Sequence, residues 1–145
     1  MSGFTLTEWI ARSPKEVFDF ISDSENAPKI GANTKSMVKL TEGPVGVGTR
    51  YSETRIMNGK ENQSELEIVG FEPGRLYAMK NVTEGVETVY TYTFQEENNG
   101  TQVDMVCELS ASGVKKLMLP MVSSILKKED GDHLQKLKMV MEENS

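Results

Sequence analysis

Tight-turn signals divide the middle of this chain into short segments, and they constrain its fold more than any other feature. Turn-forming sequences occur at Asn58-Gly59, Glu72-Pro73-Gly74, Glu84-Gly85 and Asn98-Asn99-Gly100. The segments between them are rich in β-branched and aromatic residues, and Asn-Gly is the strongest short hairpin signal. Successive strands that are joined by tight turns must run antiparallel. The sequence therefore predicts an antiparallel sheet of consecutive hairpins.

We expect seven strands, with a helical insert between the first and the second. The expected strands are Phe4–Ala11, Met37–Thr41, Thr49–Met57, Ser64–Phe71, Leu76–Thr83, Glu87–Glu96 and Thr101–Ala111. In the insert, Ser13-Pro14-Lys15-Glu16 combines an N-cap serine, a proline at N1 and a glutamate at N3, which is a strong helix start signal. This helix should end near Ser22–Asp23, and Ser24–Asn33 should form a second short helix or a turn.

The C-terminal segment Val114–Glu142 is predicted to form one long helix. Its first half carries one apolar stripe, made by Val114, Met118, Met121, Val122 and Ile125. Its second half carries another stripe about a third of a turn away, made by Leu126, Leu134, Leu137 and Met141. The change coincides with KEDGDH at Lys128–His133, which contains Gly131. Either the helix is irregular at Gly131, or its two halves contact different partners.

These elements predict an α+β fold of one domain, residues 1–145. The chain of 145 residues is near the commonest domain size, and no linker or repeat divides it. A sheet with one apolar face needs a cover, and only the C-terminal helix is long enough. We therefore expect a strongly curved, seven-stranded antiparallel sheet wrapped around the long C-terminal helix, with two short helices between strands 1 and 2. One helix cannot fill such a sheet, so a cavity between them is expected.

Six stretches, taken in their order and spacing, carry a resemblance to known proteins. They are Ser13–Phe18, Gly43–Tyr51, Phe71–Leu76, Tyr92–Phe94, Gly100–Val103 and Leu134–Glu142. Together they resemble the helix-grip (SRPBCC) superfamily, which includes START lipid-transfer domains, plant proteins of the Bet v 1 type and bacterial polyketide cyclase/dehydrase-like proteins. The resemblance covers nearly the whole chain and is greatest to the bacterial branch. It implies an apolar cavity that binds a small hydrophobic molecule, and it does not imply a reaction.

The glycine-rich stretch Glu42–Glu53, EGPVGVGTRYSE, does not fit a phosphate-binding loop. Tyr51 stands where a dinucleotide fingerprint needs glycine or alanine, and no Gly-Lys-Ser/Thr follows. The segment after the loop is a strand rather than a helix, so no helix N-terminus is present to hold an anion. The loop should join two antiparallel strands, and the resemblance implies that it lies over one end of the cavity.

The polar candidates for ligand binding lie on two of the expected strands. Tyr51, Glu53 and Arg55 share one face of the strand after the glycine loop. If Glu53 and Arg55 point inward, they form a polar group that orients a ligand; if outward, they are ordinary cross-strand charges. Tyr90 and Tyr92 share a face that the resemblance implies to be inward, and their hydroxyl groups suit a ligand cavity.

The apolar candidates are mostly methionines, of which the chain has nine. Methionine is flexible and suits adaptable apolar surfaces, although it also simply fills cores. The candidates for the cavity wall are Met79, Met105, Met118, Met121 and, on the same helical stripe, Ile125. Walls of this kind favour a flexible lipid or a polyketide-like ligand.

The lone histidine, the lone cysteine and the polar segment around Gly131 each have a simple structural explanation. His133 is the lone histidine, so no metal site and no cofactor are predicted. Cys107 lies in mid-strand among apolar residues, and an inert buried thiol is a simpler expectation than a nucleophile paired with His133. Glu129, Asp130, Asp132 and His133 form a polar interruption in the last helix, and if the helix were regular, Glu129, Asp132 and Lys136 would continue the first stripe and point toward the cavity. If Gly131 resets the helix, they are solvated, which is the simpler expectation.

Charge and composition limit the partners. The net charge of −6 disfavours nucleic acid, and no run of about 18 apolar residues predicts membrane insertion. One cysteine and an N-terminus without a signal-peptide pattern fit a cytoplasmic protein, either a monomer or a homodimer.

Two hypotheses follow for the function. The leading one is binding of a small hydrophobic molecule such as a lipid or a polyketide, for transport or sequestration. The alternative is a polyketide cyclase or aromatase that uses Glu53, Arg55 and Tyr90. Several polar side chains converging on an enclosed cavity would favour catalysis, whereas polar groups only at its mouth would favour carriage.

Overall fold

The computed structural model describes residues 2–31, 33–57 and 59–143. Its elements follow in the order β1 (Ser2–Ile10), α1 (Pro14–Ser22), the 3₁₀ turn η1 (Ser24–Asn26), α2 (Ala27–Ile30), β2 (Thr34–Lys39), β3 (Arg50–Met57), β4 (Lys60–Glu72), β5 (Leu76–Thr83), β6 (Val86–Glu97), β7 (Gly100–Ser110), the 3₁₀ turn η2 (Gly113–Met118), α3 (Leu119–Asp130) and α4 (His133–Glu143). This is the predicted order: a strand, two short helices, six strands and a C-terminal helical segment.

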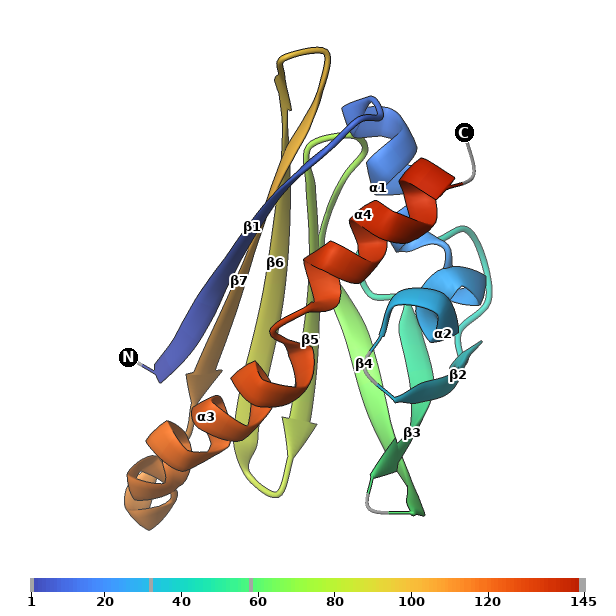
Figure 1. Ribbon diagram of the computed structural model, residues 1–145. Helices are drawn as coiled ribbons and strands as arrows, with labels where there is room; N and C mark the ends of the chain where they lie inside the picture. The colour runs from blue at the N-terminus through green and yellow to red at the C-terminus, as the bar shows by residue number, and fades with distance from the viewer. Residues whose placement is uncertain (1, 32, 58, 144–145) are drawn as a thin grey trace.

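The described residues form one seven-stranded antiparallel sheet in the order β1-β7-β6-β5-β4-β3-β2. Strands β2 to β6 each pair with the next strand in sequence, and β1 pairs with β7. The insert with α1 and α2 therefore carries the chain from one edge of the sheet to the other (Figure 1). Positive φ angles at Glu84, Gly85, Asn98 and Asn99 produce the tight turns that the sequence predicted there. The predicted turn at Asn58-Gly59 includes Asn58, which lies outside the described residues.

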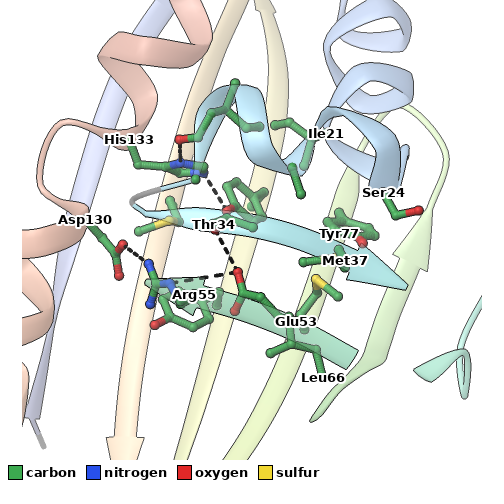
Figure 2. Close-up of a pocket in the computed structure, with 17 residues that line it drawn as sticks. Ile21, Ser24, Thr34, Met37, Glu53, Arg55, Leu66, Tyr77, Asp130 and His133 are labelled. Carbon is green, nitrogen blue, oxygen red and sulfur yellow. Dashed lines mark hydrogen bonds and ion pairs between the residues drawn. The ribbon is translucent and has the colours of Figure 1, made fainter. Parts of the chain in front are cut away.

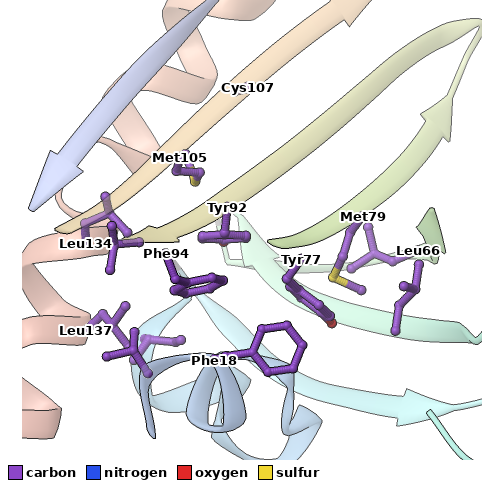
Figure 3. Packing of buried hydrophobic residues seen from close by; sticks show 14 of the residues in the cluster. Phe18, Leu66, Tyr77, Met79, Tyr92, Phe94, Met105, Cys107, Leu134 and Leu137 are labelled. Atoms are coloured by element: carbon purple, nitrogen blue, oxygen red, sulfur yellow. The ribbon is translucent and has the colours of Figure 1, made fainter. Parts of the chain in front are cut away.

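Helix α1 begins with the predicted capping box. The Ser13 hydroxyl accepts a hydrogen bond from the backbone N–H of Glu16 at 3.2 Å, and the Glu16 carboxylate accepts one from the backbone N–H of Ser13 at 3.3 Å. This start places Phe18 against the sheet, where its ring meets Phe71 and Phe94 edge-on at centroid distances of 5.2 and 5.7 Å. Figure 3 shows Phe18 within this aromatic core. The packing fixes α1 on the face of the sheet that α4 also covers.

The C-terminal helical segment is interrupted at Gly131, which is one of the two arrangements that the sequence left open. Helix α3 ends at Asp130 and α4 begins at His133 (Figure 1). A Cβ atom on Gly131 would lie only 2.5 Å from the backbone oxygen of Lys127, so the junction requires glycine. Beyond it, α4 buries Leu134, Leu137 and Met141. No helix among the described residues is long and apolar enough to cross a membrane.

Helix α3 contacts β1 and β7 through a stripe that shares only Val122 with the predicted first stripe and Leu126 with the second. The residues that pack on the core are Leu119, Val122 and Leu126. Met118, Met121 and Ile125 lie roughly a quarter of a turn away and are 47%, 55% and 47% exposed. Their predicted place in the cavity wall is thus corrected. Two neighbouring stripes of this segment are both apolar, and helical periodicity alone does not distinguish them.

Candidate ligand-binding site

A cavity of about 110 Å³ lies between the sheet and the helices that cover it. Strands β2 to β7, the segment from α1 to β2, and the junction of α3 and α4 all contribute to its walls. Its aliphatic and thioether side chains are Ile21, Ala27, Ile30, Met37, Leu66, Met79 and Met105. Its polar side chains are Ser24, Thr34, Glu53, Arg55, Tyr77, Tyr90, Tyr92, Asp130 and His133. Since one water needs about 10–15 Å³ by this measure, the space suits a small ligand.

The lining of the cavity mixes polar and apolar side chains. Figure 2 shows Arg55, Asp130 and His133 together on one side. Met37 and Leu66 lie on the opposite side, near the polar residues Ser24, Tyr77 and Glu53. A mostly apolar molecule that carries polar groups matches this lining.

Most of the predicted site residues line this cavity. They are Glu53, Arg55, Met79, Tyr90, Tyr92 and Met105. Glu53 and Arg55 therefore point inward, which settles the question that the sequence left open. Tyr51 does not line the cavity: it is buried at 1% exposure as part of the core. Met118, at the end of η2, and Met121 and Ile125, on the exposed face of α3, also lie outside the lining.

A buried ionic group connects the sheet to the end of α3. Nη2 of Arg55 lies 2.8 Å from Oδ1 of Asp130, and Nε of Arg55 lies 3.9 Å from Oε2 of Glu53. The three side chains are only 17%, 11% and 14% exposed, in the order Arg55, Asp130 and Glu53. Burial alone would lower the pKa of Arg55, but the two carboxylates outweigh it and raise that pKa. The Thr34 hydroxyl donates to Oε2 of Glu53 at 2.9 Å and fixes its position.

Burial keeps the imidazole of His133 neutral, and both of its ring nitrogens are hydrogen-bonded. Its Nδ1 lies 2.9 Å from the backbone oxygen of Ile30, which only accepts, so Nδ1 carries the proton. Its Nε2 then accepts a hydrogen bond from the Tyr92 hydroxyl at 2.8 Å. Burial lowers the pKa of His133, and the bond to Ile30 opposes only part of that effect. The pair of Tyr92 and His133 therefore adds hydrogen-bonding groups but no positive charge to the cavity.

Tyr90 provides the cavity with a hydrogen-bond donor. Burial, and then the negative charge of Asp130, raises the pKa of Tyr90, so its hydroxyl stays protonated. Within the described part of the chain, this hydroxyl has no hydrogen-bond partner. A carbonyl or hydroxyl oxygen of a ligand is the natural acceptor for it.

Comparison with known proteins agrees with this geometry. A family model described as "Polyketide cyclase / dehydrase and lipid transport" matches residues 1–142. The chain belongs to this family. No curated protein sequence matches it.

Solved structures of the same shape are distant in sequence. Ara h 8.0201 is 16% identical, with a TM-score of 0.77 and 95% coverage of each chain. TTHA0849 from Thermus thermophilus is 16% identical, with a TM-score of 0.76 and 99% coverage of each chain. The di-domain ARO/CYC BexL from the BE-7585A biosynthetic pathway is 16% identical, with a TM-score of 0.81; the match covers 98% of our chain and 47% of BexL. At this identity these likenesses establish the fold alone, a Bet v 1-like helix-grip fold.

Asp130 and His133 line the cavity, although the sequence did not predict them as site residues. The simpler expectation was that Gly131 leaves the polar segment solvated. It holds for Asp132, which is exposed and whose Oδ2 lies 3.8 Å from Nζ of Lys136. It is wrong for Asp130 and His133, which line the cavity on either side of the break. The available signal was the polar sequence around Gly131, because Asp130 and His133 flank the helix break at this glycine.

The other candidates take structural roles. Cys107 is a buried free thiol, and burial raises its pKa to about 12, so it is not a nucleophile. Among residues 2–31, 33–57 and 59–143, no three His, Cys, Asp or Glu side chains are grouped closely enough to hold a metal ion. The glycine-rich stretch connects β2 and β3, with positive φ angles at Gly43 and Gly48. None of residues 42–49 lines the cavity, so the loop does not contribute to the described site.

Proposed function

We propose that this protein binds a small, mostly hydrophobic molecule, such as a lipid or a polyketide, in the cavity between the sheet and the C-terminal helices. The observation that carries the proposal is a cavity whose apolar walls also carry several hydrogen-bonding groups. Met37 and Leu66 suit a hydrocarbon chain or ring, and the Tyr90 hydroxyl suits an oxygen of the ligand. Membership of a family named for lipid transport and polyketide chemistry supports the same proposal.

Native mass spectrometry of the purified protein tests this function. A co-purified hydrophobic molecule, or a complex with added decanamide or decanol, is the expected result. The variant Ala27→Trp should abolish the complex, because Ala27 lines the cavity and indole would fill it. Lys29→Trp is the matched control, since Lys29 is on the same short helix but exposed. Equal binding by both variants would contradict a ligand in this cavity.

A polyketide cyclase-type activity is a second candidate, and the convergence of polar groups favours it. Glu53, Arg55, Tyr90, Tyr92, Asp130 and His133 all reach the cavity. In such a reaction, Nε2 of neutral His133 would accept a proton from a carbon between two carbonyl groups. The Tyr90 hydroxyl would hydrogen-bond to the resulting enolate oxygen. The carbanion would attack a second carbonyl of the chain, and the resulting alkoxide would take the proton back from Nε2. Nε2 would then remove a second proton from the same carbon while the C–O bond breaks, and the hydroxyl group would leave with that proton as water.

This candidate requires the Tyr92 hydroxyl to move away from Nε2 of His133 when the substrate binds, because the two groups are hydrogen-bonded to each other. A poly-β-keto thioester mimic incubated with the protein should lose water, as measured by mass spectrometry. His133→Gln should stop the loss while leaving binding of the mimic in place. Binding without turnover would leave carriage as the function.

The lone buried thiol of Cys107 and the family fold are compatible with a cytoplasmic location, which we also propose.

A further inference from the structure

We propose that the cavity selects against anionic ligands and that Asp130 sets this selectivity. The inference rests on the proposed function and deepens it, because it concerns the charge of the molecule that enters. The polar end of the ligand is then an uncharged group, such as a hydroxyl, a ketone or an amide.

Arg55 is the residue to which a ligand anion would be expected to bind. Among the described residues that line the cavity, it is the only arginine or lysine. Its guanidinium group is already engaged, at 2.8 Å by Asp130 and at 3.9 Å by Glu53. His133 adds no positive charge, because its buried imidazole, which is hydrogen-bonded to Tyr92 and to the backbone oxygen of Ile30, is neutral. The lining therefore presents one positive charge against two negative charges.

A ligand carboxylate meets a penalty at this end of the cavity. Nη2 of Arg55 is already hydrogen-bonded to Asp130, so a ligand carboxylate that reaches this nitrogen comes close to the Asp130 carboxylate at the end of α3. Like charges in a buried site repel strongly, and burying an unpaired carboxylate is costly. An amide or a hydroxyl avoids both costs and accepts a hydrogen bond from Tyr90.

Asp130 controls this selectivity more than Glu53 does. Glu53 is anchored by the Thr34 hydroxyl at 2.9 Å and lies farther from the guanidinium group. Asp130 makes the shorter contact and reaches the sheet from the α3–α4 junction. Replacing Asp130 by asparagine removes one negative charge at Nη2 and leaves the charge of Arg55 less fully compensated. A ligand carboxylate then meets less repulsion and a stronger attraction to the guanidinium group.

The test measures how decanamide and decanoic acid displace the uncharged fluorescent probe N-phenyl-1-naphthylamine at pH 8. The two ligands have the same chain and nearly the same shape, and they differ in charge. The variants are Asp130→Asn and Glu53→Gln, with Asp132→Asn as the matched control. Asp132 lies two residues from Asp130, carries the same charge and is exposed, with 55% of its side chain accessible.

The native protein should bind decanamide about tenfold or more tightly than decanoic acid, given the strength of buried like-charge repulsion. Asp130→Asn should reduce this ratio severalfold by gaining affinity for the acid, and Asp132→Asn should leave it unchanged. Native protein that binds the acid as tightly as the amide would overturn the inference and leave the proposed function standing. Failure of the probe and both ligands to bind would instead refute the proposed function.

Thermal unfolding of each variant shows whether it folds. If Asp130→Asn does not fold, Glu53→Gln carries the test, because it also removes one of the two negative charges. A folded variant of either residue that keeps the native ratio would overturn the role given to these carboxylates.

Discussion

Replacing Arg55 by methionine tests whether the buried ionic group stabilises the fold. The guanidinium group of Arg55 is the positive partner of two carboxylates, and Met79 and Met105 nearby indicate that a thioether fits these surroundings. The substitution keeps an unbranched stem, and it removes the charge, the hydrogen bonds and the volume of the end of the guanidinium group. Asp130 and Glu53 are then left close together and largely buried without their cation.

The expected cost follows from this burial. Breaking a buried ion pair by removing one partner costs about 3–5 kcal/mol, because an uncompensated charge remains in a medium of low polarity. The exposures of 11% for Asp130 and 14% for Glu53 put this site near the lower end of that range, since some water reaches both carboxylates. We therefore expect Arg55→Met to lower the free energy of unfolding by about 3 kcal/mol.

Urea unfolding followed by circular dichroism measures this change. Arg50→Met is the matched control, because Arg50 lies on the same strand and pairs with Glu65 at 3.3 Å while about half of each side chain is exposed. An exposed pair of this kind contributes about 0–1 kcal/mol. The double variant Arg55→Met/Asp130→Asn should recover part of the loss. A cost for Arg55→Met no larger than that for Arg50→Met would refute the reasoning.

Three further predictions concern other parts of the molecule. Burial lowers the pKa of His133 in the folded protein from its ordinary value of 6.5. Below about pH 6.5 the unfolded chain therefore binds more protons than the folded protein, and stability decreases as the pH decreases. His133→Gln should flatten this dependence of stability on pH, and an unchanged slope in urea titrations would contradict the prediction. Gly131→Ala places a Cβ atom 2.5 Å from the oxygen of Lys127 and should cost about 1–3 kcal/mol in urea unfolding and weaken decanamide binding; a variant with native stability would show that the junction does not require glycine. Burial raises the pKa of Cys107 to about 12, so iodoacetamide at pH 8 should label it only as fast as the protein unfolds; rapid labelling of the folded protein would place the thiol at the surface.

The sheet was predictable because its turns are determined by short local sequences. Asn98-Asn99-Gly100 and Glu84-Gly85 adopt the positive φ angles of tight hairpins, and these turns set which strands are neighbours. The helix start at Ser13 was equally local, since its cap needs only Glu16 three residues later. Period-two alternation then placed Glu53 and Arg55 on one face, although it did not say which face was inward.

The C-terminal segment was less predictable because its contacts are not local. The segment 114–126 carries two adjacent apolar stripes, and only the position of β1 and β7 decides which one is buried. Asp130 reaches Arg55 across 75 positions of sequence, a distance over which residue spacing carries no information. The polar part of the site is formed where a helix break meets the sheet, so it required the tertiary structure.

Methionine methyl groups offer the most direct measurement of the central claim, that a hydrophobic ligand occupies this cavity. The cavity methionines are Met37, Met79 and Met105, and the exposed ones are Met118, Met121 and Met139. With ¹³C-methyl-labelled protein, a titration with decanamide should shift the NMR signals of the three cavity methionines and leave those of the three exposed methionines in place. Shifts confined to the exposed methionines, with the cavity signals unmoved at saturation, would contradict it.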